Sequence, residues 1–329
     1  MPPTNAPELT RAIDPATRAR FAADLSALCD PARDRVLVAV SGGPDSLALL
    51  LLAHALLGER CVAATVDHGL RPEAADEAAW VADLCAARGI GHAVLRGELP
   101  ERTGHTANLS ARARALRYEL LHAHADMVGA TRIATAHHAD DQAETLIMRL
   151  NRGAGVGGLA GVRATSGRVI RPLLGWRRAE LGAIVAAAGI VAVDDPSNVS
   201  DRFDRARLRK ALAGIDWIDP LRVAASAAAL ADAEEAIGWM VRQLGTDRVA
   251  MEGDSLTLDP RGLPFELVRR LVEQCVRQID PTADIRGGAL VRTVKALESG
   301  ETAMLGDVMA MAASPAAWRF RQAPPRRSH

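Results

Sequence analysis

The hexapeptide Ser41-Gly-Gly-Pro-Asp-Ser46 decides the fold of the chain. It follows a short apolar run rich in valine, Arg35 to Val40, and precedes a longer aliphatic run, Leu47 to Leu57. A short apolar run bounded by charge and glycine is typical of a buried parallel strand, and the longer run predicts a helix that ends at Gly58. A glycine-rich turn between such a strand and such a helix lies where an open α/β sheet binds its ligands.

The residues of the hexapeptide suit an anion and a metal ion. Gly42 and Gly43 allow backbone angles that a side chain would forbid, so that consecutive N–H groups can face a phosphate at the start of the helix. Ser41 and Ser46 add hydroxyl donors. Asp45 would repel a phosphate unless a divalent cation lay between them, and it is therefore a candidate Mg²⁺ ligand. A strand-to-helix turn capped by Ser and Asp is the structural alternative.

The alternation of strand and helix continues beyond the hexapeptide. A helix near Pro15 to Cys29 precedes the first strand. Further strands are expected at Cys61 to Val66, Gly91 to Leu95 and Arg132 to Ala136, and further helices at Glu73 to Arg88, Leu109 to Met127, Asp140 to Asn151 and Gly175 to Gly189. This order predicts an α/β fold with a doubly wound, mostly parallel sheet.

The alternation stops near a linker at Asp216-Trp-Ile-Asp-Pro220. The elements expected after it are an alanine-rich helix from about Leu221 to Leu244, a strand at Ser255 to Leu258, helices at Pro264 to Arg277 and Gly287 to Leu297, and a final strand near Ala303 to Ala310. They predict a smaller C-terminal α+β domain, followed by a disordered tail from Gln322 to His329. We divide the chain into a leader helix (1–32), a phosphate-binding catalytic domain (33–216) and a C-terminal domain (217–329).

The composition excludes one class of protein and disfavours another. The 329 residues carry 40 Lys and Arg against 40 Asp and Glu, and this net charge of zero excludes a uniformly basic nucleic-acid binder. Only two of the 40 basic residues are lysines, so arginine carries nearly all of the positive charge. Aromatic residues make up 3% of the chain, too few for a binding face built from rows of base-stacking rings.

The cysteines and the apolar runs indicate a reduced, aqueous compartment. Cys29, Cys61, Cys85 and Cys275 form no C-x-x-C pair, which argues against a zinc ribbon, an iron–sulfur site or a disulfide framework. The longest aliphatic run, Leu47 to Leu57, is too short to span a bilayer. We expect a cytoplasmic protein with no membrane partner. The oligomeric state is left open, a homodimer included.

Two other phosphate-binding patterns are disfavoured by their context. The chain has no G-x-x-x-x-G-K-[ST] sequence and no lysine near the hexapeptide, which disfavours γ-phosphate transfer of the Walker type. Gly153-Ala-Gly-Val-Gly-Gly158 satisfies G-x-G-x-x-G, but it follows an expected helix rather than a strand. We interpret it as part of a flexible, substrate-facing loop over Gly153 to Gly167.

The hexapeptide resembles the S-G-G-x-D-S signature of the PP-loop pyrophosphatase superfamily, whose members cleave ATP between the α- and β-phosphates to adenylate a substrate. Other segments resemble, in order and spacing, the tRNA(Ile)-lysidine synthase family. These segments are Val66-Asp-His-Gly-Leu-Arg71, Asn108 to Tyr118, Thr135 to Thr145, Arg152 to Gly161 and Arg171-Pro-Leu-Leu174. The resemblance covers roughly residues 35 to 210.

The resemblance implies an activity, its cofactors and its partners. The enzyme would use ATP and Mg²⁺ to adenylate the C2 oxygen of the wobble cytidine in a tRNA(Ile) with a CAU anticodon, releasing pyrophosphate. The ε-amine of free L-lysine would then displace AMP, and the lysidine formed would make the tRNA decode AUA. ATP would be bound by Ser41, Gly42, Gly43, Pro44, Asp45 and Ser46. The C-terminal domain would grip tRNA.

Paired acids near the start of a helix suit this chemistry. Asp141 and Glu144 are spaced i, i+3, so both carboxylates point to one face. They could hold Mg²⁺ or the lysine ammonium, or accept its proton, since an amine attacks only when neutral. Two acids favoured by the helix dipole are the structural alternative. His137 and His138 beside Asp140 suggest either a metal cluster or a hinge with one buried histidine, and we assign no transition metal.

Three arginine-rich stretches are candidate surfaces for tRNA. The first includes Arg112, Arg114 and Arg117 on an acid-free part of a helix, and the second runs acid-free from Arg163 to Arg178. The third, Phe203-Asp-Arg-Ala-Arg-Leu-Arg209, resembles the family pattern F-x-R-N-x-I-R, with Ala206 in place of the usual Asn. We assign Arg114, Arg171, Arg205 and Arg209 to tRNA binding, and Asp45, Asp141, Glu144 and Arg117 to catalysis.

Three alternatives stand against this interpretation. A PP-loop tRNA thiolase would need a sulfur-carrying cysteine or cluster, and the cysteines lie outside the matched motifs; an amidotransferase would need a glutaminase domain, and none is recognisable. A non-catalytic nucleotide- or tRNA-binding protein on the same scaffold would be expected to lose its acids, yet Asp45, Asp141 and Glu144 are present.

Overall fold

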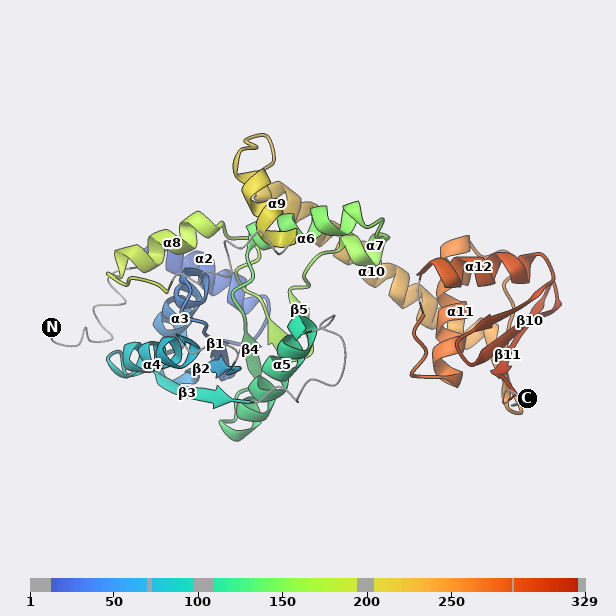
Figure 1. Ribbon diagram of the computed structural model, residues 1–329, viewed down its shortest axis with the longest axis horizontal. Helices are drawn as coiled ribbons and strands as arrows, with labels where there is room; N and C mark the ends of the chain where they lie inside the picture. The colour runs from blue at the N-terminus through green and yellow to red at the C-terminus, as the bar shows by residue number, and fades with distance from the viewer. Residues whose placement is uncertain (1–12, 70–72, 98–108, 194–203, 286, 325–329) are drawn as a thin grey trace. The chain divides into compact units, whose positions relative to one another are not determined.

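The structure is a computed structural model (Figure 1), and it describes residues 13–69, 73–97, 109–193, 204–285 and 287–324. The chain forms two compact units, Met1–Ala231 and Asp232–His329. The boundary between them lies within a long helix, whereas the boundary expected from the sequence lies at residue 216. The function of each part of the chain remains a prediction.

A six-stranded sheet with the order β3-β2-β1-β4-β6-β5 is the centre of the first unit. Its strands are β1 (Val36–Ala39), β2 (Cys61–Asp67), β3 (Gly91–Arg96), β4 (Arg132–Ala134), β5 (Thr165–Ser166) and β6 (Val169–Ile170). All neighbouring strands run parallel except β5 and β6. The α/β fold with a doubly wound, mostly parallel sheet is therefore confirmed.

Helices precede, separate and follow these strands. They are α2 (Pro15–Ser26), α3 (Pro44–Leu57), the 3-10 turn η1 (Gly58–Arg60), α4 (Glu73–Ala86), α5 (Leu109–Met127), α6 (Ala139–Asn151), α7 (Val156–Leu159), α8 (Arg178–Ala187) and α9 (Asp204–Ala213), followed by α10 (Pro220–Arg248). Among the residues that the structure describes, no helix combines the length and the apolar composition that a membrane span requires.

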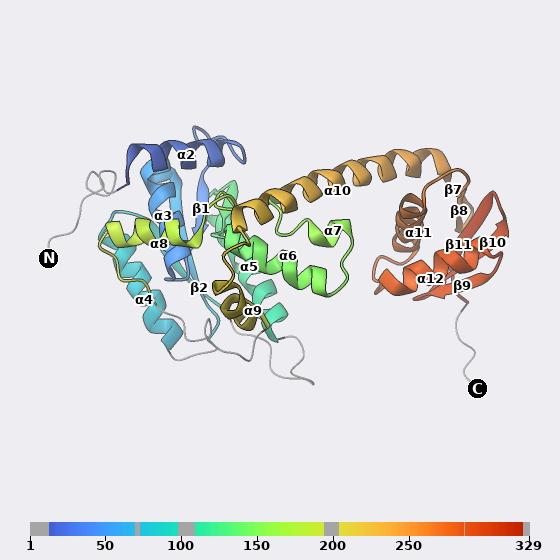
Figure 2. The ribbon, with the colours of Figure 1, turned by 90° about the horizontal axis from the view of Figure 1, so that it is seen from above.

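The alternating residues of β1 explain why helices pack on both faces of the sheet. Val36 and Val38 belong to a core shared with α2, α3, α4 and α8. Leu37 and Ala39 point the other way and pack with Leu121 of α5. All four β1 residues are at most 2% exposed, as expected of a strand buried on both faces. Figure 2 shows α3, α4 and α8 on one side of β1 and β2, and α5 on the other.

The carboxyl ends of β1, β2 and β4 meet at one edge of this sheet, where an open α/β sheet binds ligands. Strand β1 leads into the hexapeptide and α3, and β4 leads through residues 135–138 into α6. The starts of α3 and α6 are therefore brought to the same edge.

The second unit is a smaller α+β domain. It contains β7 (Val249–Glu252), β8 (Ser255–Leu258), α11 (Phe265–Ile279), α12 (Gly287–Glu298), β9 (Thr302–Leu305), β10 (Val308–Ser314) and β11 (Ala317–Gln322). The strands form an antiparallel sheet with the order β7-β8-β11-β10-β9. An apolar core separate from that of the first unit joins this sheet to α11 and α12.

One sequence-based expectation for this unit is wrong. The single strand expected at Ala303 to Ala310 is a hairpin, because Gly306, at φ +63°, turns the chain between β9 and β10. Of the tail expected to be disordered from Gln322 to His329, Gln322 is the last residue of β11, and residues 325–329 lie outside the described residues, so that expectation stays a prediction. Strands β7 and β11 were not expected from the sequence at all.

Candidate active site

The hexapeptide folds into a loop that leaves the start of α3 open. The Ser46 hydroxyl accepts the N–H of Ser41 at 3.1 Å and donates to the Gly43 carbonyl at 2.9 Å. Gly42 has φ +81°, and its carbonyl accepts the N–H of Val193 at 3.1 Å. Gly43, the N-cap of α3, has no side chain that could cap the helix. The first N–H groups of α3 and the positive end of its dipole are thus left for an anion.

A buried histidine joins this loop to the start of α6. His138, the N-cap of α6, is fully buried, and its Nε2 lies 3.4 Å from Asp45 Oδ2 and 3.5 Å from Asp141 Oδ2. Its Nδ1 lies 3.6 Å from Asp140 Oδ2. Burial by itself lowers the pKa of His138, but the contacts with Asp140 and Asp45 and the charge of Asp141 outweigh burial and raise the pKa to about 9. His138 is therefore a cation at neutral pH, held by three carboxylates.

Asp140 ties the start of α6 to the start of α8. Its Oδ2 accepts the N–H of Arg178 at 2.8 Å and lies 3.4 Å from Arg177 Nε. Burial by itself raises the pKa of Asp140, but these contacts and that with His138 outweigh it and lower the pKa well below its usual value. Asp140 is ionised, and it fixes the backbone of residues 177 and 178 against α6.

Glu144 lies one helical turn further along α6, surrounded by three guanidinium groups. The carboxylate is 3% exposed and accepts hydrogen bonds from Arg205 Nε at 2.9 Å and Arg209 Nε at 2.8 Å. Arg178 Nη2 lies 3.5 Å away. Burial raises the pKa of Glu144, but the three arginines outweigh burial and lower it. One carboxylate among three guanidiniums leaves excess positive charge for an anionic ligand.

A second group of arginines lies around His137. Burial and then the charges of Arg171, Arg114, Arg117 and Arg205 lower the pKa of His137 to about 3, so this histidine is neutral. Its Nδ1 lies 3.0 Å from the Thr135 hydroxyl. The four arginines come from α5, from the segment after β6 and from α9, so the fold gathers charge that is dispersed along the sequence.

The structure places most of the site residues expected from the sequence close together. Asp45, Asp141, Glu144, Arg205 and Arg209 form one cluster with the hexapeptide, and Arg114 and Arg117 lie beside His137. Arg171 does not reach the surface: it is 7% exposed, and its Nη1 donates to the Arg163 carbonyl at 2.7 Å. Arg71, Asn108 and Phe203 of the matched segments lie outside the described residues.

Three residues of the cluster were not singled out for a role from the sequence: His138, Asp140 and Arg178. A hinge with one buried histidine was one of two interpretations of the His137–His138 pair; His138 is buried, and the hinge stays a prediction. Its position immediately before the first turn of a helix was the available signal, because an N-cap side chain is fixed by the backbone that it caps.

Arginines of the stretch from Arg163 to Arg178 form ion pairs with acids of the same chain. Arg168 pairs with Asp126, Arg177 with Asp140 and Arg178 with Glu144. These partners lie 34 to 42 residues away in the sequence. The stretch is thus not the open basic surface that the absence of acids within it suggested.

The glycine-rich segment after α6 is held by side chains of α6, contrary to the flexible loop expected from the sequence. Gln142 makes two hydrogen bonds of 2.7 Å with the backbone of Val162, and Arg149 Nη1 donates to the carbonyls of Gly158 at 2.6 Å and Gly161 at 3.0 Å. The segment also contains α7 and β5.

Gly161→Ala should destabilise the first unit more than Gly167→Ala. Both residues have positive φ, +65° and +57°. A Cβ at Gly161 would also clash with Gln142 Oε1, whereas a Cβ at Gly167 meets nothing within 4 Å. In urea unfolding we expect Gly167→Ala to lower the free energy of unfolding by about 1 kcal/mol and Gly161→Ala by about 3 kcal/mol, because the latter also breaks hydrogen bonds. Equal losses would show that Gln142 does not hold the segment.

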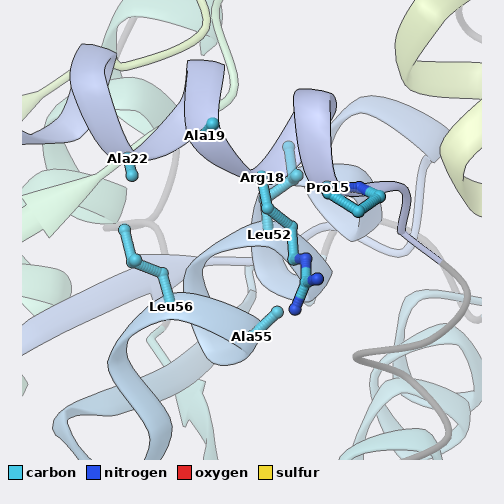
Figure 3. Close-up of a pocket in the computed structure, with 7 residues that line it drawn as sticks. All are labelled: Pro15, Arg18, Ala19, Ala22, Leu52, Ala55 and Leu56. Carbon is cyan, nitrogen blue, oxygen red and sulfur yellow. The ribbon is translucent and has the colours of Figure 1, made fainter.

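A pocket of about 280 Å³ between α2 and the second half of α3 lies apart from this cluster (Figure 3). It is lined mainly by alanine and leucine, with Arg18 as the charged residue. Its α3 residues, Leu52, Ala55 and Leu56, belong to the end of that helix remote from the hexapeptide, so the pocket is not part of the candidate active site.

Asp45 is the carboxylate best placed to bind a metal ion. Its Oδ1 is buried and has no hydrogen-bond partner among the residues that the structure describes. Mg²⁺ usually takes one or two carboxylates and fills its other positions with water and phosphate oxygens. Among all the residues that the structure describes, no three His, Cys, Asp or Glu side chains are grouped so that they could hold a metal ion by themselves. Asp45 thus fits an Mg²⁺ ion that is carried by phosphate.

The fold and this edge of the sheet define a PP-loop protein, and a family model described as a PP-loop domain matches residues 17–214. The chain is 48% identical to a tRNA(Ile)-lysidine synthase from Novosphingobium aromaticivorans, over 94% of this chain and 94% of that protein. It is 41% identical to one from Zymomonas mobilis subsp. mobilis, over 91% of this chain and 92% of that protein. The chain belongs to the tRNA(Ile)-lysidine synthase family.

A solved structure with a similar fold is that of a U34-tRNA thiolase from Methanococcus maripaludis, with a TM-score of 0.54 and 19% identity. The likeness covers 65% of this chain and 78% of the thiolase chain. At this level of identity it shows the fold alone.

Proposed function

We propose that the protein ligates L-lysine to C2 of the wobble cytidine in the CAU-anticodon tRNA(Ile), with ATP as the activating substrate. The C2 oxygen of the cytidine attacks the α-phosphate of ATP, and pyrophosphate leaves. The ε-amine of lysine then forms a bond with C2 and loses a proton, and AMP leaves with the former C2 oxygen. The tRNA thereby changes from decoding AUG to decoding AUA. Membership of the family supports this reaction.

The observation that carries the proposal is the contact of one histidine with carboxylates from two helices. Asp45 lies in the first turn of α3 and belongs to the hexapeptide, which we call the phosphate loop. Asp141 lies in the first turn of α6. The Nε2 of His138 lies within 3.5 Å of both carboxylates. A base adenylated at the phosphate loop would therefore lie beside the acids of α6, where an amine can reach it.

The phosphate loop, Ser41 to Ser46, would bind ATP. The free N–H groups at the start of α3 and the Ser41 hydroxyl would face the phosphates. Asp45 would hold Mg²⁺ through Oδ1, and the bound ion would neutralise charge on the phosphates and on the departing pyrophosphate. Arg117, beside His137, would add positive charge where negative charge develops on the transferred group.

The two acids of α6 have different surroundings, and we assign them different roles. Asp141 is 16% exposed and has one arginine contact, Arg205 Nη2 at 3.5 Å, which leaves room for a lysine ammonium and for its proton. Glu144 is 3% exposed and is enclosed by Arg178, Arg205 and Arg209. Glu144 would orient these arginines toward the anionic substrate.

Arg114→Ala should weaken tRNA binding and make its salt dependence shallower by about one unit in the log–log slope, since one phosphate contact is lost. Arg114 is exposed on α5, where its guanidinium stacks over the Tyr118 ring at 5.1 Å. Arg33→Ala is the control, because Arg33 is 89% exposed and precedes β1, at the opposite end of the strand from the hexapeptide. Binding of labelled tRNA over a KCl series would measure both slopes, and a wild-type slope for Arg114→Ala would remove it from the tRNA surface.

The reaction products test the proposed function. Purified protein given ATP, Mg²⁺, L-lysine and the CAU-anticodon tRNA(Ile) should release pyrophosphate and AMP in equal amounts, and only in the presence of that tRNA. Production of ADP, or equal turnover without tRNA, would contradict the proposal.

The thiolase alternative gains no support from the cysteines. Cys29, Cys61, Cys85 and Cys275 are all buried in apolar cores, and burial raises the pKa of each thiol. A buried thiol with a raised pKa is a poor carrier of sulfur, because the thiolate is the reactive form. The non-catalytic alternative is disfavoured by the clustered acids of α3 and α6.

The remaining assignments are also proposals. The reaction uses ATP, lysine and tRNA, which are cytoplasmic, and we place the protein there. The second unit would grip tRNA away from the catalytic cluster. A homodimer is compatible with either assignment.

A further inference from the structure

We propose that helix α2 and Trp176 form a brace that positions the start of α6, and with it the carboxylates of the catalytic cluster. We define the Trp176 brace as Arg20, Phe21, Asp24 and Trp176. The expected changes in KM rest on the proposed function, whereas the expected changes in hydrogen exchange rest on the geometry alone.

The indole of Trp176 is held by three side chains of α2. It is 1% exposed, and its Nε1 donates to Asp24 Oδ2 at 2.8 Å. The Arg20 guanidinium lies 4.0 Å from the centre of the indole, and the Phe21 ring meets it edge to face at 6.5 Å between centroids. A hydrogen bond, a cation–π contact and an aromatic pair thus act on one side chain.

Arg20 also binds residues on both sides of Trp176 in the sequence, the backbone of Gly175 and the side chain of Glu180. Its Nη2 donates to the Gly175 carbonyl at 2.6 Å, and its Nη1 donates to Glu180 Oε1 at 2.6 Å. Glu180 in turn accepts the N–H of Arg177 at 2.7 Å. The segment from residue 175 to residue 180 is therefore fixed to α2 at several points.

The segment from residue 175 to residue 180 also contacts the start of α6. The Trp176 carbonyl accepts the N–H of Ala139, the first residue of α6, at 2.8 Å. The next two residues, Arg177 and Arg178, contact Asp140 and Glu144. A shift of the indole would move all of these contacts together, whereas the phosphate loop has hydrogen bonds of its own and meets the start of α6 through His138.

Asp24→Ala should therefore weaken the use of lysine more than the use of ATP. We expect the KM for lysine to rise at least about fivefold while the KM for ATP stays within about twofold, because the brace segment bonds directly to the start of α6 and reaches the phosphate loop only through His138. Trp176→Phe, which keeps a ring but cannot donate, should do the same, and the double variant should be no worse than the worse single one. Asp24→Asn retains an acceptor oxygen and should restore nearly normal kinetics.

Asp14→Ala is the control for a general weakening of α2, because Asp14 is the N-cap of that helix and makes none of the contacts of the brace. Asp14 caps α2 by accepting the N–H of Thr17 at 3.0 Å. Hydrogen exchange at residues 139–145, followed without substrates, should be faster in Asp24→Ala than in the wild type and unchanged in Asp14→Ala.

The two readouts separate failure of the brace from failure of the proposed function. A wild-type protein that makes no lysidine would refute the proposed function. Hydrogen exchange at residues 139–145 would then be the test of whether the brace positions α6. Equal exchange at 139–145 in Asp24→Ala and Asp14→Ala would overturn the brace, and so would equal changes in the KM for lysine and for ATP.

Discussion

Asp45→Asn should abolish pyrophosphate release while leaving the protein folded. Asp45 is the carboxylate of the phosphate loop with a buried, unpartnered Oδ1 among the described residues, and its Oδ2 faces the His138 cation. An amide has no charge to offer either the metal ion or the histidine. Loss of about 3 kcal/mol of transition-state stabilisation corresponds to a fall in kcat of about 10²-fold or more.

Asp83→Asn is the control for this variant, since Asp83 is exposed on α4 and undergoes the same chemical change. Release of pyrophosphate with lysine omitted would measure the adenylation step alone. Thermal unfolding of Asp83→Asn should resemble that of the wild type, whereas Asp45→Asn should unfold at a lower temperature but remain folded at the assay temperature, because it removes one of the three carboxylates around buried His138. A kcat within about threefold of the wild-type value for Asp45→Asn would show that Asp45 does not act in adenylation.

Glu144→Gln should stop the second step and destabilise the first unit. The glutamine would leave Arg178, Arg205 and Arg209 without their shared counter-charge in a site where the carboxylate is 3% exposed. Removal of one partner from a buried charge network costs about 3–5 kcal/mol of stability. We expect the rate of lysine transfer to fall at least about 10²-fold because the arginines no longer hold the adenylated substrate in place.

Asp141→Asn should behave differently from Glu144→Gln, because Asp141 is the more open of the two carboxylates. It should retain pyrophosphate release, raise the KM for lysine and cost little stability. Glu119→Gln, on the exposed face of α5, is the isosteric control for Glu144. Single-turnover release of AMP from pre-adenylated tRNA separates the two steps. Unchanged AMP release in Glu144→Gln would show that Glu144 is only a structural residue.

Elements defined by local patterns were predictable from the sequence. Three elements were found where they were expected, because the residue pattern that predicts each one lies within the element itself. They are the buried strand at Val36–Ala39, the helix at Leu109–Met127 and the strand at Ser255–Leu258. The hairpin of β9 and β10 was not predicted, because only two residues, Gly306 at φ +63° and Asp307, separate the two apolar runs. Strand β11 alternates Trp318 and Phe320 with two arginines, too short a pattern to stand out.

Some residues of the candidate site could likewise be predicted from the sequence, and others could not. Asp45, Asp141 and Glu144 lie in motifs whose residue spacing suits their chemistry, so they could be proposed from the sequence. The partners of Arg168, Arg177 and Arg178 lie tens of residues away, and a charge pattern along the chain contains no information about them. Arg171 was assigned to tRNA binding, which stays a prediction; its low exposure of 7% could not be predicted, because its surroundings are set by tertiary packing.

Mass spectrometry of the anticodon loop tests the central claim most directly. The protein would be incubated with ATP, Mg²⁺, isotopically labelled L-lysine and the CAU-anticodon tRNA(Ile), and the tRNA then digested to nucleosides. Our account predicts that the wobble cytidine gains the mass of the labelled lysine less one water, and that no other nucleoside carries label. An unmodified wobble cytidine, or label at any other position, would contradict it.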